Sequence, residues 1–246
     1  MIYFLLSLTV YDKVTNMNNN LSARAIKIVA ILQQALPIKE KDFVSLWVGK
    51  KFSGNIYRIL VATILSQSCT DKASLAAYYE LDLRIGVTPQ NIARAANDII
   101  ENCIRVCGLQ RMKTKALKSV SKEVLKHKDM LQTVLKLPLD EARESLMALP
   151  GVGPKTADVV LLTAGNKPII PVDTHVDRIS KRLELVPKKG GYEVVRSSLE
   201  KLLPKKDYHS SHLLLIALGR RYCKAINPLC DICPVRKLCP YPENLE

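Results

Sequence analysis

The chain has 246 residues, 48% of them hydrophobic, so it can bury one large core or two modest ones and is not a disordered protein. Lys and Arg number 37 against 23 Asp and Glu, and the formal net charge of +14 favours a polyanionic partner. Nucleic acid is the leading partner, a solubilising basic surface or an acidic membrane surface being the alternatives, and the three Phe and one Trp argue against a single-strand-binding stacking platform.

The first ten residues, MIYFLLSLTV, are apolar but do not form a signal peptide. No basic residue precedes the apolar run, and no small-residue cleavage site follows it. The run is also too short to span a bilayer. Because Met17 precedes three asparagines, translation could begin there, and we interpret residues 1–16 as a non-native or disordered N-terminal extension. We therefore expect a protein that is not secreted and has no membrane partner.

Apolar residues recur at helical spacing along most of the chain, and strand signals are almost absent. Residues 59–65 are apolar on nearly every side, which predicts a helix at the centre of a core. Three further segments carry one apolar stripe each: Leu117, Val120 and Val124; Ala157, Val160, Leu161 and Ala164; and Tyr192, Val195, Leu199 and Leu202. The pattern predicts an all-α fold.

Proline and glycine mark the expected ends of the helices. Thr88 followed by Pro89 predicts an N-cap and a first helical residue. Gly86, Gly108 and Gly165 fall where helices should end.

Residues 149–157 read L-P-G-V-G-P-K-T-A and predict a hairpin between two helices, over residues 146–164. Gly151 and Gly153 permit conformations and close approaches that a side chain would block, and Pro154 can open the second helix. Amides at such a helix start bind phosphate oxygens whatever the base sequence. G-V-G alone is a weak signal, but the following Lys155 and Thr156, in a basic chain, make it a strong prediction of a DNA-backbone contact.

Four cysteines close to the C-terminus predict a metal centre. They form a C-x6-C-x2-C-x5-C array made of Cys223, Cys230, Cys233 and Cys239. Structural zinc sites usually contain two C-x2-C pairs, whereas only one is present here. The wider, unequal spacings favour a [4Fe-4S] cluster held by four thiolates, with zinc as the alternative. Two disulfides are a third reading, but nothing else in the chain indicates an oxidising compartment.

Taken together, these motifs resemble those of the endonuclease III family of DNA glycosylases, in the helix-hairpin-helix superfamily. The hairpin, a V-D-T-H-V-D-R segment at residues 172–178 and G-R-R-Y-C leading into the cysteine array stand in the family's order and spacing. The resemblance implies a six-helix barrel domain over residues 53–166 and a discontinuous iron-sulfur cluster domain formed by residues 17–52 and 167–246. Duplex DNA with damaged bases or abasic sites would lie across the cleft between them. We expect a cytoplasmic, nucleoid-associated monomer.

The residues also suggest a reaction. A primary amine that attacks the anomeric carbon of a nucleotide expels the base and leaves an imine, which acidifies the neighbouring proton so that the 3′ phosphate can be eliminated. Lys155 is the candidate amine, and its alternative role is ordinary phosphate binding. Asp173 is the candidate for stabilising positive charge on the sugar, while a helix N-cap is its structural alternative.

This reading predicts a bifunctional DNA glycosylase and AP lyase of base excision repair that removes oxidised pyrimidines and cleaves 3′ to the abasic site by β-elimination. Relatives that only remove a base carry another residue in place of the lysine. A monofunctional mismatch or uracil/thymine DNA glycosylase, and a non-catalytic DNA-binding iron-sulfur protein, are the alternatives. Because attack by an amine needs no electron transfer, we expect the cluster to be structural. His175 and His212 are interpreted as structural residues.

The damaged nucleotide must leave the duplex, so other side chains should fill the vacated space. A loop that reads L-S-Q-S-C-T-D is similar to the family's polar wedge, which points to Gln67 or Ser68, and a G-L-Q segment is similar to its leucine wedge, which points to Leu109. A helix cap or a core role is the alternative. Three lysines after that leucine are expected to contact phosphate, unless they only solvate a helix face: Lys113, Lys115 and Lys118.

Overall fold

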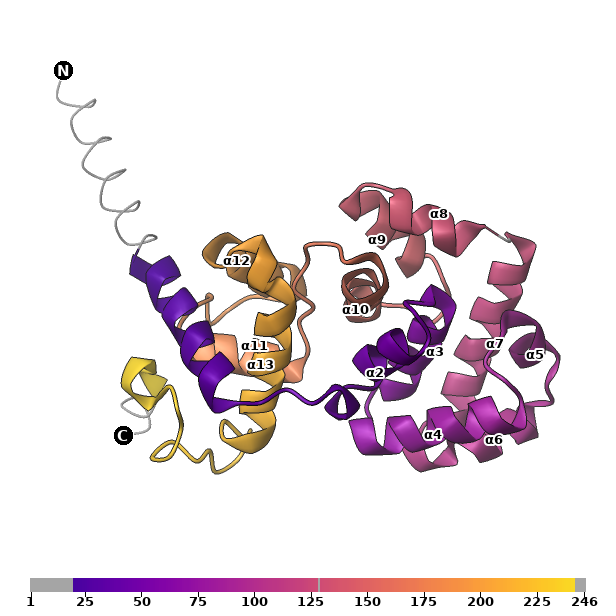
Figure 1. Ribbon diagram of the computed structural model, residues 1–246, viewed down its shortest axis with the longest axis horizontal. Helices are drawn as coiled ribbons and strands as arrows, with labels where there is room; N and C mark the ends of the chain where they lie inside the picture. Colours follow the sequence, from indigo (N-terminus) through magenta and orange to yellow (C-terminus); the bar gives the residue numbers. More distant parts are fainter. Residues whose placement is uncertain (1–19, 128, 242–246) are drawn as a thin grey trace, which may run out of the picture. The chain divides into compact units, whose positions relative to one another are not determined.

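The computed structural model describes residues 20–127 and 129–241, and in these ranges the chain is helical without a β-strand, which confirms the predicted fold class (Figure 1). The predicted extension at residues 1–16 lies outside the described residues. The chain divides into two compact units, one of Lys39–Lys167 and one of Met1–Ile38 with Pro168–Glu246. No helix in the described ranges is long and apolar enough to cross a membrane.

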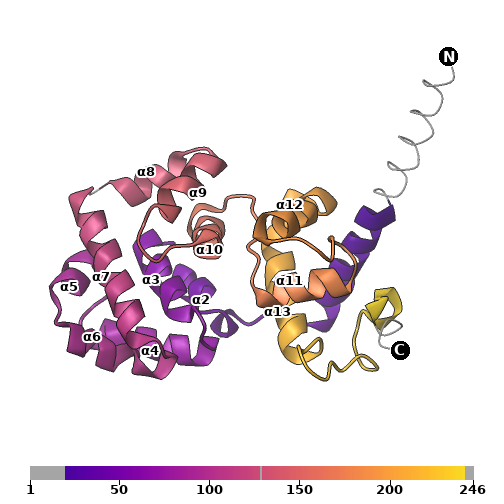
Figure 2. The ribbon, with the colours of Figure 1, turned by 180° about the vertical axis from the view of Figure 1, so that it is seen from behind.

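The unit of residues 39–167 is built around one apolar helix. Its helices are α2 (Val44–Lys51), α3 (Ile56–Ser66), α4 (Asp71–Arg84), α5 (Pro89–Arg94), α6 (Asn97–Ile104), α7 (Gln110–Lys126), α8 (Met130–Lys136), α9 (Leu139–Met147) and α10 (Pro154–Gly165), with 3-10 turns η1 (Glu40–Asp42) and η2 (Arg105–Cys107). Every residue of the 59–65 segment is buried, as predicted. Figure 2 shows α3 between α7 and α10, and it also packs on α2 and α4.

The expected helix ends are also found. The Thr88 side chain accepts a hydrogen bond from the Asn91 amide, and Pro89 is the first residue of α5. Gly86 follows α4 with φ +78°. The last residue of α10 is Gly165, although the left-handed conformation that ends the helix belongs to Asn166, with φ +47°.

The first boundary between the units lies elsewhere than expected. The structure puts it between Ile38 and Lys39, whereas the sequence analysis placed it between residues 52 and 53. The reason is α2, whose apolar face packs on α3 and α10 and therefore belongs to their core. The second boundary follows Lys167, one residue after the expected end of the barrel domain.

The other unit combines both ends of the chain. Described residues 20–35 are helical, and the C-terminal segment contributes α11 (Thr174–Arg182), α12 (Tyr192–Leu202) and α13 (Tyr208–Arg221), with 3-10 turns η3 (Lys205–Asp207) and η4 (Arg236–Leu238). The N-terminal helix is tied to the rest of its unit by hydrogen bonds from Ser22 Oγ to the Leu202 carbonyl and from Arg24 to the Leu183 carbonyl, both 2.7 Å. Helix α11 packs on α13 and α12.

Candidate functional site

The hairpin between α9 and α10 depends on one of its two glycines. Gly151 has φ +81°, and a Cβ placed there would lie 2.7 Å from the Cβ of Ala116 on α7. Gly153 is different, because its φ is −94° and a Cβ added to it would meet no atom within 4 Å. The fold itself therefore requires glycine at position 151 but not at position 153.

This difference predicts opposite outcomes for two alanine substitutions. Gly151→Ala should lower the free energy of unfolding by about 1–3 kcal/mol, because it adds both backbone strain and an overlap with α7. Gly153→Ala should cost no more than about 1 kcal/mol, the loss of a favourable N-cap residue. Urea denaturation measures both. If Gly153→Ala also weakens DNA binding, the added methyl group reports the close approach of a phosphate, because no protein atom is near it.

Helix α10 begins at the hairpin and carries Lys155 as its second residue, with the side chain partly exposed. The helix starts without a side-chain cap. Amides of a first helical turn have no carbonyl partner within their helix, and the dipole adds partial positive charge there, so this end suits a phosphate. Thr156 is buried, with 3% exposure of the whole residue, and its Oγ1 accepts a hydrogen bond from Gln67 Nε2, so it does not present the surface to DNA that the sequence predicted.

A buried ion pair holds the first turns of α10 against α9. Arg143 donates through Nε and Nη2 to the two carboxylate oxygens of Asp158, at 2.7 and 3.3 Å. The two residues are 7% and 0% exposed. Asp158 lies three residues after Lys155, so the pair fixes the turn that carries the candidate amine. The sequence analysis missed it, although an aspartate inside the apolar stripe of residues 157–164 is the signal of a buried charge with a partner.

The two candidate polar wedge residues have different surroundings. Gln67 is the residue directly after α3, and its Nε2 donates to the Gly151 carbonyl and to Thr156 Oγ1, both at 3.1 Å. Its amide group is therefore engaged with the hairpin. Ser68 is exposed and has φ +51°. The choice of wedge stays a prediction, but Ser68 is the residue whose side chain faces solvent.

Leu109 is exposed in a conformation that leucine rarely adopts. Its φ is +51° and 49% of the residue is accessible. A left-handed conformation costs a non-glycine residue about 1–2 kcal/mol, and such strain is concentrated at functional sites. Val106 and Met112, which the sequence analysis did not single out, are also exposed, at 60% and 69%. The loop thus presents apolar side chains to solvent, as a wedge requires.

The structure corrects the role predicted for Lys113. The residue is 2% exposed, and its Nζ donates to the Leu65 and Cys107 carbonyls, each at 2.8 Å, so it does not present its charge to phosphate. The physical reason is its position on the buried face of α7, four residues before Leu117 in the same stripe. Of the other two lysines, Lys115 is exposed, and Lys118 donates to the Ala95 carbonyl at 2.6 Å.

Asp173 caps α11, which confirms the structural role considered for it. Its Oδ1 accepts hydrogen bonds from the amides of His175 and Val176, at 2.9 and 2.8 Å. Both of these hydrogen bonds use the same carboxylate oxygen. The carboxylate is half-buried, so it can cap the helix with one oxygen and present the other to a reacting group.

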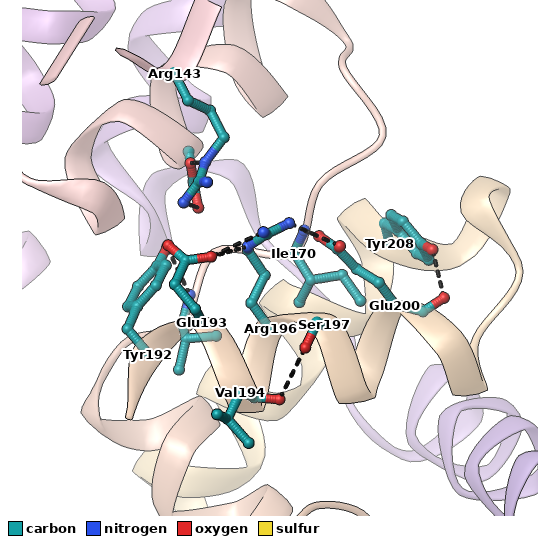
Figure 3. Close-up of polar contacts among 11 residues, drawn as sticks. Arg143, Ile170, Tyr192, Glu193, Val194, Arg196, Ser197, Glu200 and Tyr208 are labelled. Carbon is teal, nitrogen blue, oxygen red and sulfur yellow. Dashed lines mark hydrogen bonds and ion pairs between the residues drawn. The ribbon is translucent and has the colours of Figure 1, made fainter. Parts of the chain in front are cut away.

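The segment before Asp173 is held by three contacts. The Ile170 amide donates to Glu200 Oε1 at 3.0 Å, and the Val172 amide donates to Tyr192 Oη at 3.3 Å. In Figure 3, Arg196 lies between Glu193 and Glu200 and pairs with both carboxylates, which orients Glu200 toward Ile170. The third contact joins the Pro171 carbonyl oxygen to Nδ1 of His212, at 2.9 Å.

Both histidines are structural, as expected. His212 is 5% exposed, and its Nδ1 lies 2.9 Å from the Pro171 carbonyl oxygen. His175 pairs with Arg178 Nη2 at 3.1 Å. It also packs so closely on α13 that a Cβ at Gly219 would lie 2.5 Å from its Nδ1.

The four cysteines of the C-terminal array line one small hollow. All seven cysteines of the chain are free thiols, so the disulfide alternative is wrong. Burial raises the pKa of the Cys233 thiol, and the three other cysteines of the array raise it further.

Two arginines of α11 organise this loop. Arg178 donates through Nε and Nη2 to the Cys223 carbonyl, at 3.2 and 2.9 Å. Arg182 donates to Cys223 Sγ at 3.3 Å and to the Lys224 carbonyl at 2.6 Å, and its guanidinium stacks 4.2 Å from the centre of the Tyr241 ring. A positive donor beside sulfur stabilises a thiolate ligand.

The arrangement fits a cluster better than a single ion. In residues 20–127 and 129–241, no three Cys, His, Asp or Glu side chains converge closely enough to hold one metal ion. Four thiols around a common hollow instead match the corners of a [4Fe-4S] cube. The four cysteines therefore fit the predicted iron-sulfur cluster.

Replacing one cluster ligand should remove most of the iron. Cys233→Ser takes away a thiolate, and because metal binding contributes to folding the variant should also melt at a lower temperature. Cys69→Ser is the matched control, since Cys69 is a half-buried thiol outside the array and its variant should keep the iron. Iron content and visible absorbance measure the effect. A Cys233→Ser protein with full iron content would contradict the assignment.

Two family models match this chain, one over the hairpin and its surroundings and one over the cysteine array. Residues 61–205 match the HhH-GPD superfamily base excision DNA repair protein model, and residues 223–239 match the iron-sulfur binding domain of endonuclease III. The second match begins at Cys223 and ends at Cys239, so it contains the four predicted ligands.

Curated relatives and solved structures are also similar to this chain. Endonuclease III of Sulfolobus acidocaldarius is 36% identical over 211 residues, covering 85% of this chain and 92% of that protein. Endonuclease III of Bacillus subtilis is 35% identical over 185 residues, covering 75% and 81%. A trapped endonuclease III-DNA covalent intermediate superposes with a TM-score of 0.68 at 29% identity, covering 85% of this chain and 99% of that chain. A thermostable thymine-DNA glycosylase has a TM-score of 0.68 at 20% identity, covering 94% and 99%, and shares the fold.

Proposed function

The chain belongs to the endonuclease III family of the HhH-GPD superfamily of base excision DNA repair proteins, and from this membership we propose which residues act and on which lesion. It is a DNA glycosylase and AP lyase with an iron-sulfur cluster. We propose that it removes oxidised pyrimidines from duplex DNA and cleaves the abasic site 3′ by β-elimination. The observation that carries the lyase assignment is a lysine as the second residue of α10, directly after the hairpin.

In the proposed reaction, Lys155 Nζ forms a bond to the anomeric carbon of the extruded nucleotide while the bond to the base breaks and the base leaves with a proton. Loss of the amine protons and opening of the sugar give an imine. Removal of a proton from the adjacent carbon then breaks the bond to the 3′ phosphate. The Asp173 carboxylate stabilises positive charge on the sugar as the base departs.

The DNA contacts follow from the geometry of residues 39–167. The hairpin amides around Gly151 and Gly153 bind one phosphate. Leu109 enters the duplex from one loop and Ser68 or Gln67 from the other. Solved endonuclease III-DNA complexes, one covalently trapped and one non-covalent, are similar to this chain at 29% and 30% identity, which supports a duplex partner.

We assign the cluster a structural role. Cys223, Cys230, Cys233 and Cys239 would hold it, and it would fix a loop whose basic residues Lys224, Arg236 and Lys237 face the nucleic acid. With the boundaries that the structure gives, residues 39–167 act as the barrel domain and the chain on either side of them acts as the cluster domain. The protein acts as a monomer on nucleoid DNA in the cytoplasm.

Borohydride trapping of the cluster-loaded protein on an abasic duplex tests the lyase step, because hydride reduces the imine to a stable covalent adduct. We expect an adduct. A DNA-binding, cluster-loaded protein that gives none would instead be a monofunctional glycosylase. Single-turnover base release from matched duplexes with an oxidised pyrimidine, an oxidised purine or a T·G mismatch tests the lesion, and fastest release of the pyrimidine is the expected result.

A further inference from the structure

One buried lysine joins the two loops that carry the candidate wedge residues. Lys113 Nζ donates to the carbonyl of Leu65, two residues before Gln67, and to the carbonyl of Cys107, two residues before Leu109, both at 2.8 Å. Two carbonyls held by one ammonium group lie close together, so neither loop can shift without breaking one of these bonds. A buried lysine with 2% exposure is rare in proteins unless its charge has partners.

A second set of contacts extends this connection to the catalytic lysine. Gln67 Nε2 donates to the Gly151 carbonyl of the hairpin and to Thr156 Oγ1, which neighbours Lys155. Lys113 therefore connects the loop of Leu109 to the end of α3. Gln67, which follows α3, in turn connects that end to the hairpin and the start of α10. All of these residues belong to the unit of residues 39–167.

We propose that Lys113 is a positioning residue for base extrusion, which sets where Leu109 stands relative to Lys155 by tying the two wedge loops together. The inference rests on the proposed function, since it assigns a task to the loops during the same reaction. Leu109 needs such support, because its left-handed backbone, with φ +51°, persists only where the surroundings hold it. Lysine suits this task, since its ammonium group has three donors on a long stem and can serve both carbonyls.

The test is Lys113→Met in the cluster-loaded protein, which keeps an unbranched stem only one atom shorter and removes the donors. Single-turnover base excision from a duplex with an oxidised pyrimidine should fall on the order of 10- to 100-fold, the effect of a small displacement of a positioning group. Cleavage of a single-stranded abasic oligonucleotide, which needs no extrusion from a duplex, should stay within about twofold of wild type. Lys122→Met is the control, since it removes the same charge from an exposed position of the same helix.

A double-mutant cycle separates positioning from a general structural role. If Lys113 acts through Leu109, adding Lys113→Met to Leu109→Ala should slow duplex excision little further. Independent effects that multiply would overturn the proposal, as would equal losses on duplex and single-stranded substrates. If the methionine variant does not fold, Lys113→Arg replaces it, because arginine keeps the charge and donors in another geometry, and the same contrast between substrates is expected.

Failure of this proposal is distinguishable from failure of the lyase assignment. Wild-type protein that traps no adduct on single-stranded abasic DNA contradicts the lyase chemistry itself. Wild-type protein that traps the adduct, together with a Lys113→Met variant unimpaired on duplex DNA, contradicts only the positioning role.

Discussion

Lys155→Gln should abolish the borohydride-trapped adduct and slow strand cleavage at an abasic site by more than about 10³-fold, since glutamine has no amine that can form the imine. Glutamine keeps a polar side chain of similar length, so the start of α10 and its contact with Gln67 should persist. Gel electrophoresis of trapped and untrapped reactions measures both quantities. Visible absorbance of the cluster and DNA affinity confirm that the variant is folded.

The result separates the two roles considered for this lysine. A phosphate-binding lysine would weaken DNA affinity on substitution but leave the adduct, formed by another amine. Lys122→Gln is the matched control, since Lys122 is an exposed lysine of the same unit and its variant should react like wild type. An adduct that survives in Lys155→Gln would remove Lys155 from the mechanism.

Asp173→Asn should slow base excision about 10²- to 10³-fold with little change in stability. Asparagine is as good an N-cap as aspartate, so its side-chain oxygen can still accept the His175 and Val176 amides, while the negative charge is lost. Asp173→Ala removes both functions and should also lower the free energy of unfolding by about 1 kcal/mol. Single-turnover kinetics and urea denaturation measure the two effects separately.

A cap elsewhere provides the control. Thr88→Ala removes the side-chain cap of α5 and should lower stability without changing the rate of excision. If Asp173→Asn is as active as wild type and only Asp173→Ala is impaired, the carboxylate has the structural role alone.

The features that could be predicted from the sequence are local ones. The cap at Thr88 and Pro89, the buried helix over residues 59–65 and the cysteine array each depend on residues within a few positions of one another. The hairpin is similar, because the φ of Gly151 and the start of α10 follow from the order of glycine and proline. Spacing alone reveals such features.

The contacts that fix the site geometry join distant segments, and spacing does not reveal them. Lys113 looked like a surface lysine, although it extends the buried stripe of α7 back by one turn. Gln67 stays a candidate wedge residue, and the hydrogen bond of its amide to a hairpin more than eighty residues later could not be read from spacing. The Arg143–Asp158 pair joins two helices, and its only sign in the sequence is an aspartate among the apolar residues of α10.

Helix α11 has nine residues, and so a length of about 14 Å. Its N-cap is Asp173, and its last turns carry the two arginines that bind the cysteine loop. A rigid rod of this length fixes the spacing between the proposed catalytic carboxylate and the cluster ligands. We therefore expect a chain made during iron shortage to leave one end of this rod without its support and to excise bases more slowly than the cluster-loaded protein.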